Sequence, residues 1–156
     1  EELESDYNRW SRLAQENTGK IEAPVLHPIE RRPVRQRDFL DPTPEDPRQQ
    51  VWVRALGNLG DDLCRHQTVL AFMSDFALLG TALMPHPYTG MSENLQSASL
   101  DHALWFHEEF SADDWLLHTV EAERIGGGRG LARGNFYTRQ GRLVATTMQQ
   151  GVMRFR

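Results

Sequence analysis

Residues 61–82 read DDLCRHQTVLAFMSDFALLGTA, and this stretch decides the fold that the sequence predicts. Its apolar side chains recur at intervals of three and four, and it contains no proline, which is typical of a helix with one wide apolar face. Asp61 and Asp62 suit the first turn, where carboxylates meet the positive end of the helix dipole. Pro85 and Pro87 follow and end the pattern. We therefore expect one long helix, roughly 33 Å from end to end at about 1.5 Å per residue.

Asp75 does not fit this apolar pattern, because its neighbours in the chain include Phe72, Met73 and Phe76. Burying an unpaired carboxylate costs several kcal/mol. In one explanation, Ser74 or Asp75 caps a second helix after a break, or Asp75 faces solvent. In the other, Asp75 is a catalytic carboxylate held in an apolar groove. From this stretch alone, both explanations stay open.

The rest of the chain predicts strands that can wrap around this helix. Alternating or β-prone residues mark strands at residues 29–34, 50–56, 94–107, 115–123, 131–138 and 143–153. Pro33 limits the first strand to a sheet edge, and residues 139–142 form a tight hairpin turn. Short connections favour antiparallel pairing, so the predicted class is α+β, with an antiparallel sheet around one long central helix.

Simple alternation assigns side chains to the two faces of the late strands. In residues 94–107 it places Ser99 with Asp101 on one face and Leu100 on the other. In the last strand, Gln149 shares a face with Thr147 and other side chains typical of a core. An amide on an inner face needs hydrogen-bond partners, so Gln149 is either a structural link or a group that orients a ligand.

Composition limits the class of protein. With 156 residues the chain forms one domain of ordinary size, and a net charge of -5 argues against binding nucleic acid through phosphate contacts. No apolar run approaches the roughly 18 residues of a membrane span. The single cysteine, Cys64, indicates a packed thiol in a reducing compartment, and we expect a cytoplasmic location. Residues 1–28 are a polar linker or short helix, and residues 29–156 are the domain.

Other candidate sites are weaker. The run RIGGGRG could cradle a phosphate with Arg124 and Arg129, or form a flexible hairpin loop. It lacks the ending of a P-loop and does not open a helix. Histidines at 86, 102 and 107 have no partners at metal-ligand or zinc-protease spacing, and no serine lies in a nucleophile elbow. Structural histidines are therefore expected, and neither a metal nor a cofactor is predicted.

Four segments together resemble the C-terminal half of the type II acyl-CoA thioesterases. They are RQQVWVRALG (48–57), MSDFALLGTALMPH (73–86), ASLDHALWFH (98–107) and GRGLARGNFYTRQGRLVATTMQQGVMR (128–154). The Ser-Asp within the helix, the Leu-Asp-His strand and the Gln-x-Gly-Val-Met-Arg ending are the specific parts. The resemblance implies a hot-dog fold, in which a curved antiparallel sheet surrounds a helix, and hydrolysis of acyl-CoA thioesters.

The resemblance also implies a set of site residues. The family's Asp, Thr or Ser, and Gln fall on Asp75, Ser99 and Gln149, which would position a hydrolytic water. The family carries an N-terminal hot-dog unit before this region, and this chain opens on Glu1 without a methionine. We therefore expect a segment to precede it in the natural protein. We also expect pairing with a second copy or with a separate N-terminal unit.

Two rival functions stay open. One is a hot-dog domain that binds acyl-CoA or a partner unit without turnover. The other is a hydratase or dehydratase on the same fold. A hydratase would need a histidine paired with a carboxylate, and the predicted helix gives Asp75 no obvious histidine partner.

Overall fold

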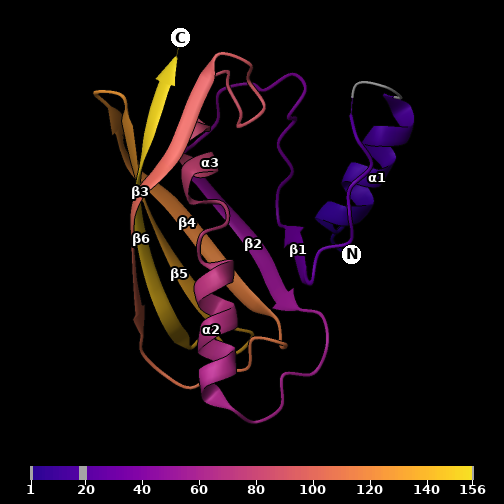
Figure 1. Cartoon of the computed structure of the whole chain (residues 1–156), viewed down its shortest axis with the longest axis vertical. Helices are drawn as coiled ribbons and strands as arrows, with labels where there is room; N and C mark the ends of the chain where they lie inside the picture. Colours follow the sequence, from indigo (N-terminus) through magenta and orange to yellow (C-terminus); the bar gives the residue numbers. More distant parts are fainter. Residues whose placement is uncertain (1, 18–20, 156) are drawn as a thin grey trace.

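The computed structural model describes residues 2–17 and 21–155 and contains one six-stranded antiparallel sheet. From edge to edge the strands are β1 (Ile29–Pro33), β2 (Arg48–Ala55), β4 (Leu116–Gly126), β5 (Arg129–Thr138), β6 (Leu143–Phe155) and β3 (Leu95–Phe106). All six predicted strands form, and the strand that ends at Pro33 lies at an edge. Two helices cover one face of the sheet, and a third lies beyond β1 (Figure 1).

The predicted single helix is two helices, α2 (Leu63–Met73) and α3 (Leu78–Leu83). Ala77 separates them with a φ of 72°, a left-handed conformation that costs a residue with a Cβ about 1–2 kcal/mol. The surrounding structure holds it there, because the Ala77 carbonyl accepts hydrogen bonds from Gln49 Nε2 at 3.0 Å and from Thr81. Apolar spacing continues across the break, so periodicity favoured one helix and left a second helix after a break near Asp75 as the alternative, which the structure has.

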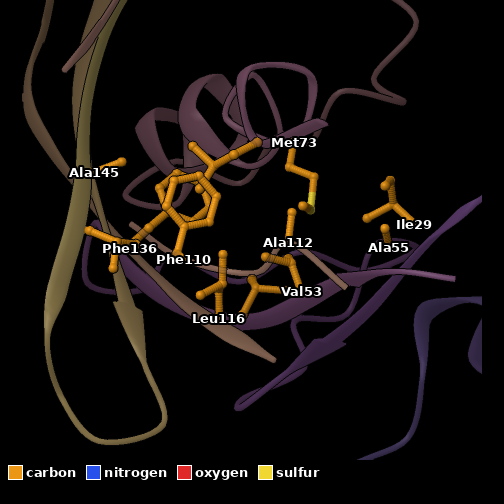
Figure 2. Close-up of a cluster of buried hydrophobic side chains, with 12 residues drawn as sticks. Ile29, Val53, Ala55, Met73, Phe110, Ala112, Leu116, Phe136 and Ala145 are labelled. Atoms are coloured by element: carbon orange, nitrogen blue, oxygen red, sulfur yellow. The ribbon is translucent and has the colours of Figure 1, made fainter. Parts of the chain in front are cut away.

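The main core lies between α2 and the sheet. Leu70 and Met73 point from α2 into a cluster that also includes Val53, Leu116 and Phe136, from three different strands. Figure 2 shows the Met73 side chain reaching from the helix towards the strands. Because these side chains are almost fully buried, they fix the height and rotation of α2 over the sheet.

The His66 side chain links the start of α2 to the loop after β3 through its two ring nitrogens. Its Nε2 lies 2.8 Å from the Gly60 carbonyl, and its Nδ1 accepts a hydrogen bond from Ala112 N–H at 3.0 Å. Asp62 caps the helix through the Cys64 N–H. Cys64 itself, the second residue of α2, is exposed, so the expectation of a packed thiol was wrong.

A helix at the N-terminus, α1 (Asp6–Glu16), contacts β1 and begins at Ser5, whose Oγ accepts a hydrogen bond from Asn8 N–H. Part of residues 1–28 therefore forms a short helix, one of the two structures predicted for this segment. The division between a linker and a domain at residue 29 stays a prediction. No helix among the described residues has the length and apolar character to cross a membrane.

Gly134→Ala should destabilise the fold by about 1–3 kcal/mol, because the inner face of β5 has no room for a methyl group there. An added Cβ would lie 2.8 Å from Thr147 Cγ2 and closer still to His118 Nε2, in a fully buried layer. Chemical denaturation measures the change. The control is Gly80→Ala in α3, where nothing lies within 4 Å and the same methyl should raise helix stability by up to about 1 kcal/mol. Equal stability of Gly134→Ala and wild type would contradict this packing.

Candidate active site

The break between α2 and α3 brings Asp75 to the sheet, where it meets Ser99 and Gln149. Gln149 Nε2 donates hydrogen bonds to Asp75 Oδ1 and, at 2.9 Å, to Ser99 Oγ. The three residues, called here the candidate set, come from the helix break, β3 and β6. The structure therefore joins side chains that lie 50 and 74 positions apart in the sequence.

The amide of Gln149 has a fixed orientation. An ionised carboxylate only accepts hydrogen bonds, so the NH₂ group of Gln149 must face Asp75, and its two hydrogens serve Asp75 and Ser99. Gln149 is fully buried on the inner face with Thr147, the face that alternation predicted. Among the residues that the structure describes, the second oxygen of Asp75 and the hydroxyl hydrogen of Ser99 are available for a further partner. This arrangement can orient a water and accept its proton.

Asp75 is exposed rather than held in an apolar groove, which corrects that expectation and agrees with the alternative in which it faces solvent. The helix break is the reason, because it turns the carboxylate away from the core side of α2 and towards β6. The capping alternative does not describe it either. Ser74, not Asp75, is the C-cap of α2, and Ala77 precedes α3 without a side-chain cap. Asp75 instead uses its carboxylate to accept the hydrogen bond from Gln149.

A β-bulge in β3 corrects the predicted faces of that strand. Ser99 pairs with Gly151 and Asp101 with Gln150, so Leu100 is an extra residue in the ladder. The bulge resets the alternation, and His102 rather than Asp101 follows Ser99 on the face beneath the helices. Asp101 secures the bulge, since its Oδ1 accepts a hydrogen bond from Gln150 N–H at 2.9 Å. Alternation cannot detect a bulge, and it therefore misplaced Asp101.

Beside the candidate set lies a polar cluster that sequence reasoning did not find. His102 Nε2 lies 2.8 Å from Ser74 Oγ and 3.2 Å from Thr147 Oγ1. The sequence predicted a structural role for His102 and His107. The His107 ring lies 2.9 Å from Thr146 Oγ1, on the other face of β6, and its structural role stays a prediction. The only sequence signal for the cluster is the position of Ser74 and Thr147 close to Asp75 and Gln149.

The glycine run forms the tight turn between β4 and β5, as its hairpin alternative predicted. Gly127 and Gly128 have φ values of 62° and 73°, which suit a two-residue turn that matches the twist of the strands. Among the described residues, no group of three or more metal-ligating side chains gathers. The candidate set itself offers a carboxylate, a hydroxyl and an amide.

Comparison with known proteins gives this chemistry a context. The family model described as acyl-CoA thioesterase matches residues 23–152. The chain belongs to the acyl-CoA thioesterase family. Human acyl-coenzyme A thioesterase 8 is 41% identical over 128 residues, and acyl-CoA thioesterase 2 of Haemophilus influenzae is 39% identical over 107. These matches cover 81% and 69% of this chain but only 40% and 37% of the relatives. The chain thus spans less than half the length of the curated relatives it matches.

Solved structures agree with this family and fold. The acyl-CoA thioesterase II TesB2 of Mycobacterium marinum is 45% identical, with a TM-score of 0.71, and the match covers 83% of this chain and half of that one. A hot-dog protein from Alicyclobacillus acidocaldarius is only 17% identical but reaches a TM-score of 0.63, which shows the fold alone. The predicted hot-dog fold is therefore confirmed, with the single central helix replaced by α2 and α3.

Proposed function

We propose that this chain carries the water-activating residues of an acyl-CoA thioesterase, which hydrolyses acyl-CoA to a free fatty acid and CoA. The observation that carries the proposal is the amide of Gln149, which donates hydrogen bonds to both Asp75 and Ser99. Membership of the acyl-CoA thioesterase family and relatives named for that activity support it. Neither a metal nor a cofactor takes part in the proposed reaction.

In the proposed mechanism, Asp75 acts as the general base. A water held by Asp75 and Ser99 transfers a proton to the carboxylate while its oxygen attacks the carbonyl carbon of the thioester. The tetrahedral intermediate then collapses, the carbon–sulfur bond breaks, and the proton passes to the CoA sulfur. Gln149 keeps the carboxylate and the hydroxyl in place, so these groups lose little orientational freedom when the transition state forms.

An apolar hollow that reaches the helix break at Phe76, and that none of the three candidate residues lines, would accept the acyl chain. Phe76, the residue after Asp75, lines a hollow of about 470 Å³ together with Trp10, Val25 and Leu26. This volume lies in the range of small-molecule sites, which are about 300–1,000 Å³. A hydrocarbon chain bound in this hollow would displace water from these apolar side chains, and removing apolar surface from water favours binding.

Pairing with another hot-dog unit would complete the cleft. β3 is an edge strand that carries Ser99, and both Ser99 and Asp75 are exposed. Large apolar side chains at this side of the molecule are about half exposed, among them Leu100 and Trp105 at 51% each. The partner is either a second copy of this chain or a separate N-terminal unit. The exposed thiol of Cys64, with no second cysteine to pair with, fits the proposed cytoplasmic location.

A thiol-release assay tests this function. Acyl-CoA esters of several chain lengths are incubated with the purified chain, alone and with an N-terminal hot-dog unit supplied, and free CoA is measured with a thiol reagent. We expect hydrolysis in the assembly that completes the cleft. Tight binding of acyl-CoA without release of CoA in either sample would contradict the proposal and favour a non-catalytic binding domain.

A further inference from the structure

A single histidine connects the two segments that carry the candidate set. His102 lies on β3, contacts Ser74 next to Asp75, and contacts Thr147 two residues before Gln149. We propose that His102 is a positioning residue: its Nε2–H group ties the helix break to β6 and so holds Asp75 within reach of Gln149. The proposal rests on the function proposed above and adds a residue to it.

The hydrogen bonds around His102 define which ring nitrogen carries the proton. Ser74 Oγ donates its hydrogen to the Ala71 carbonyl at 2.8 Å, and Thr147 Oγ1 donates its hydrogen to the Ala103 carbonyl at 3.1 Å. Each hydroxyl has one hydrogen, so while it donates to its carbonyl its oxygen accepts from the ring. All of these hydrogen bonds form together when Nε2 carries the proton and donates one hydrogen shared between the two hydroxyls, and we infer this tautomer.

The two hydrogen bonds of His102, called here the tether, hold the helix break in a place where core packing does not hold Asp75. Asp75 is exposed, and the side-chain contact that the structure gives it is the hydrogen bond from Gln149. Ser74, by contrast, is fully buried and held to both α2 and His102. Fixing Ser74 fixes the backbone that leads into Asp75. Because His102 is itself exposed on an edge strand, its removal should disturb this placement more than the stability of the fold.

The test compares three replacements of His102 in the assembly that releases CoA. Glutamine carries an N–H donor at about the reach of Nε2, asparagine places its amide nearer the backbone, and leucine has no donor. We expect His102→Gln to keep kcat within about threefold of wild type. His102→Asn and His102→Leu should lower kcat about 10- to 100-fold with little change in KM or Tm, the scale of loss expected from small displacements of reacting groups. The control is His107→Leu, which should keep kcat.

Two further measurements separate the tether from the function itself. Nitrogen-15 NMR of the chain alone should show His102 protonated at Nε2, with this signal perturbed in Ser74→Ala. Wild-type kcat in His102→Leu, equal losses in His102→Gln and His102→Leu, or protonation at Nδ1 would each overturn the positioning role. If Asp75→Asn also keeps full activity, or if no assembly hydrolyses acyl-CoA, the proposed function fails as well. If Asp75→Asn loses activity while His102→Leu keeps wild-type kcat, the positioning role of His102 is overturned and the proposed function remains.

Discussion

Asp75→Asn should lower kcat for acyl-CoA hydrolysis about 10³-fold, in the middle of the range for loss of a general base. Asparagine has the same shape but cannot take a proton from water at neutral pH. It also replaces one carboxylate oxygen with an NH₂ group, which would face the donating amide of Gln149 unless its own amide turns. KM should change little, because Asp75 acts on the water rather than on the bound acyl chain. Steady-state kinetics of CoA release measures both constants.

The control for this substitution is Asp61→Asn, which makes the same chemical change at an exposed carboxylate near the start of α2. It should leave kcat within about twofold of wild type, as a surface change far from the reacting groups does. Circular dichroism and thermal unfolding should show that both variants are folded. Hydrolysis close to the wild-type rate in folded Asp75→Asn would end the assignment of a catalytic base to this residue.

Acid should destabilise this fold through His118, a fully buried histidine on β4 that stacks on Phe136. Burial lowers the pKa of His118 to about 3, with smaller contributions from Arg31 and His102. The unfolded chain binds a proton at this residue below about pH 6.5, whereas the folded chain does not, so stability falls as the pH drops from 6.5 towards 3. The expected loss from this one residue is about 1.4 kcal/mol per pH unit, or about 3 kcal/mol between pH 6.5 and 4.5.

Replacing His118 by leucine should remove this contribution. Denaturant unfolding across pH 4.5–7 should show a shallower dependence of the unfolding free energy on pH for His118→Leu than for wild type, by about 1.4 kcal/mol per pH unit. The matched control is Phe136→Leu, which changes the stacked partner and should lower stability by a similar amount at every pH. Parallel curves for wild type and His118→Leu would show that His118 is not the group responsible.

The sheet was predictable because strand patterns are local. Pro33 marked an edge strand, the hairpin at residues 139–142 followed from its turn residues, and alternation placed Gln149 on the buried face. The candidate set came from the resemblance to a known family rather than from these patterns. The structure brings its three members together, and their catalytic role stays a prediction for kinetics to test.

In two features the surrounding structure overrides a local pattern: the helix break, which the sequence left open as one of two alternatives, and the bulge in β3, which it did not predict. Ala77 adopts a left-handed conformation that its own preferences disfavour, since Gln49 and Thr81 hold its carbonyl from outside the break. Leu100 adds one residue to β3 without a glycine or proline to mark the bulge. Each feature changes the direction of nearby side chains: the break turns Asp75 towards Gln149, and the bulge puts His102, rather than Asp101, on the same face as Ser99.

The two edges of the sheet are unequal, and this limits how copies of the chain can assemble. β1 spans only five residues, ends at Pro33 and is flanked by α1, so it is a poor template for a further strand. β3 spans twelve residues with most of its side chains open to solvent. When two copies pair through their β3 strands, only the β1 edges remain exposed. Because β1 is a poor template, assembly should stop at a closed dimer instead of continuing into fibres.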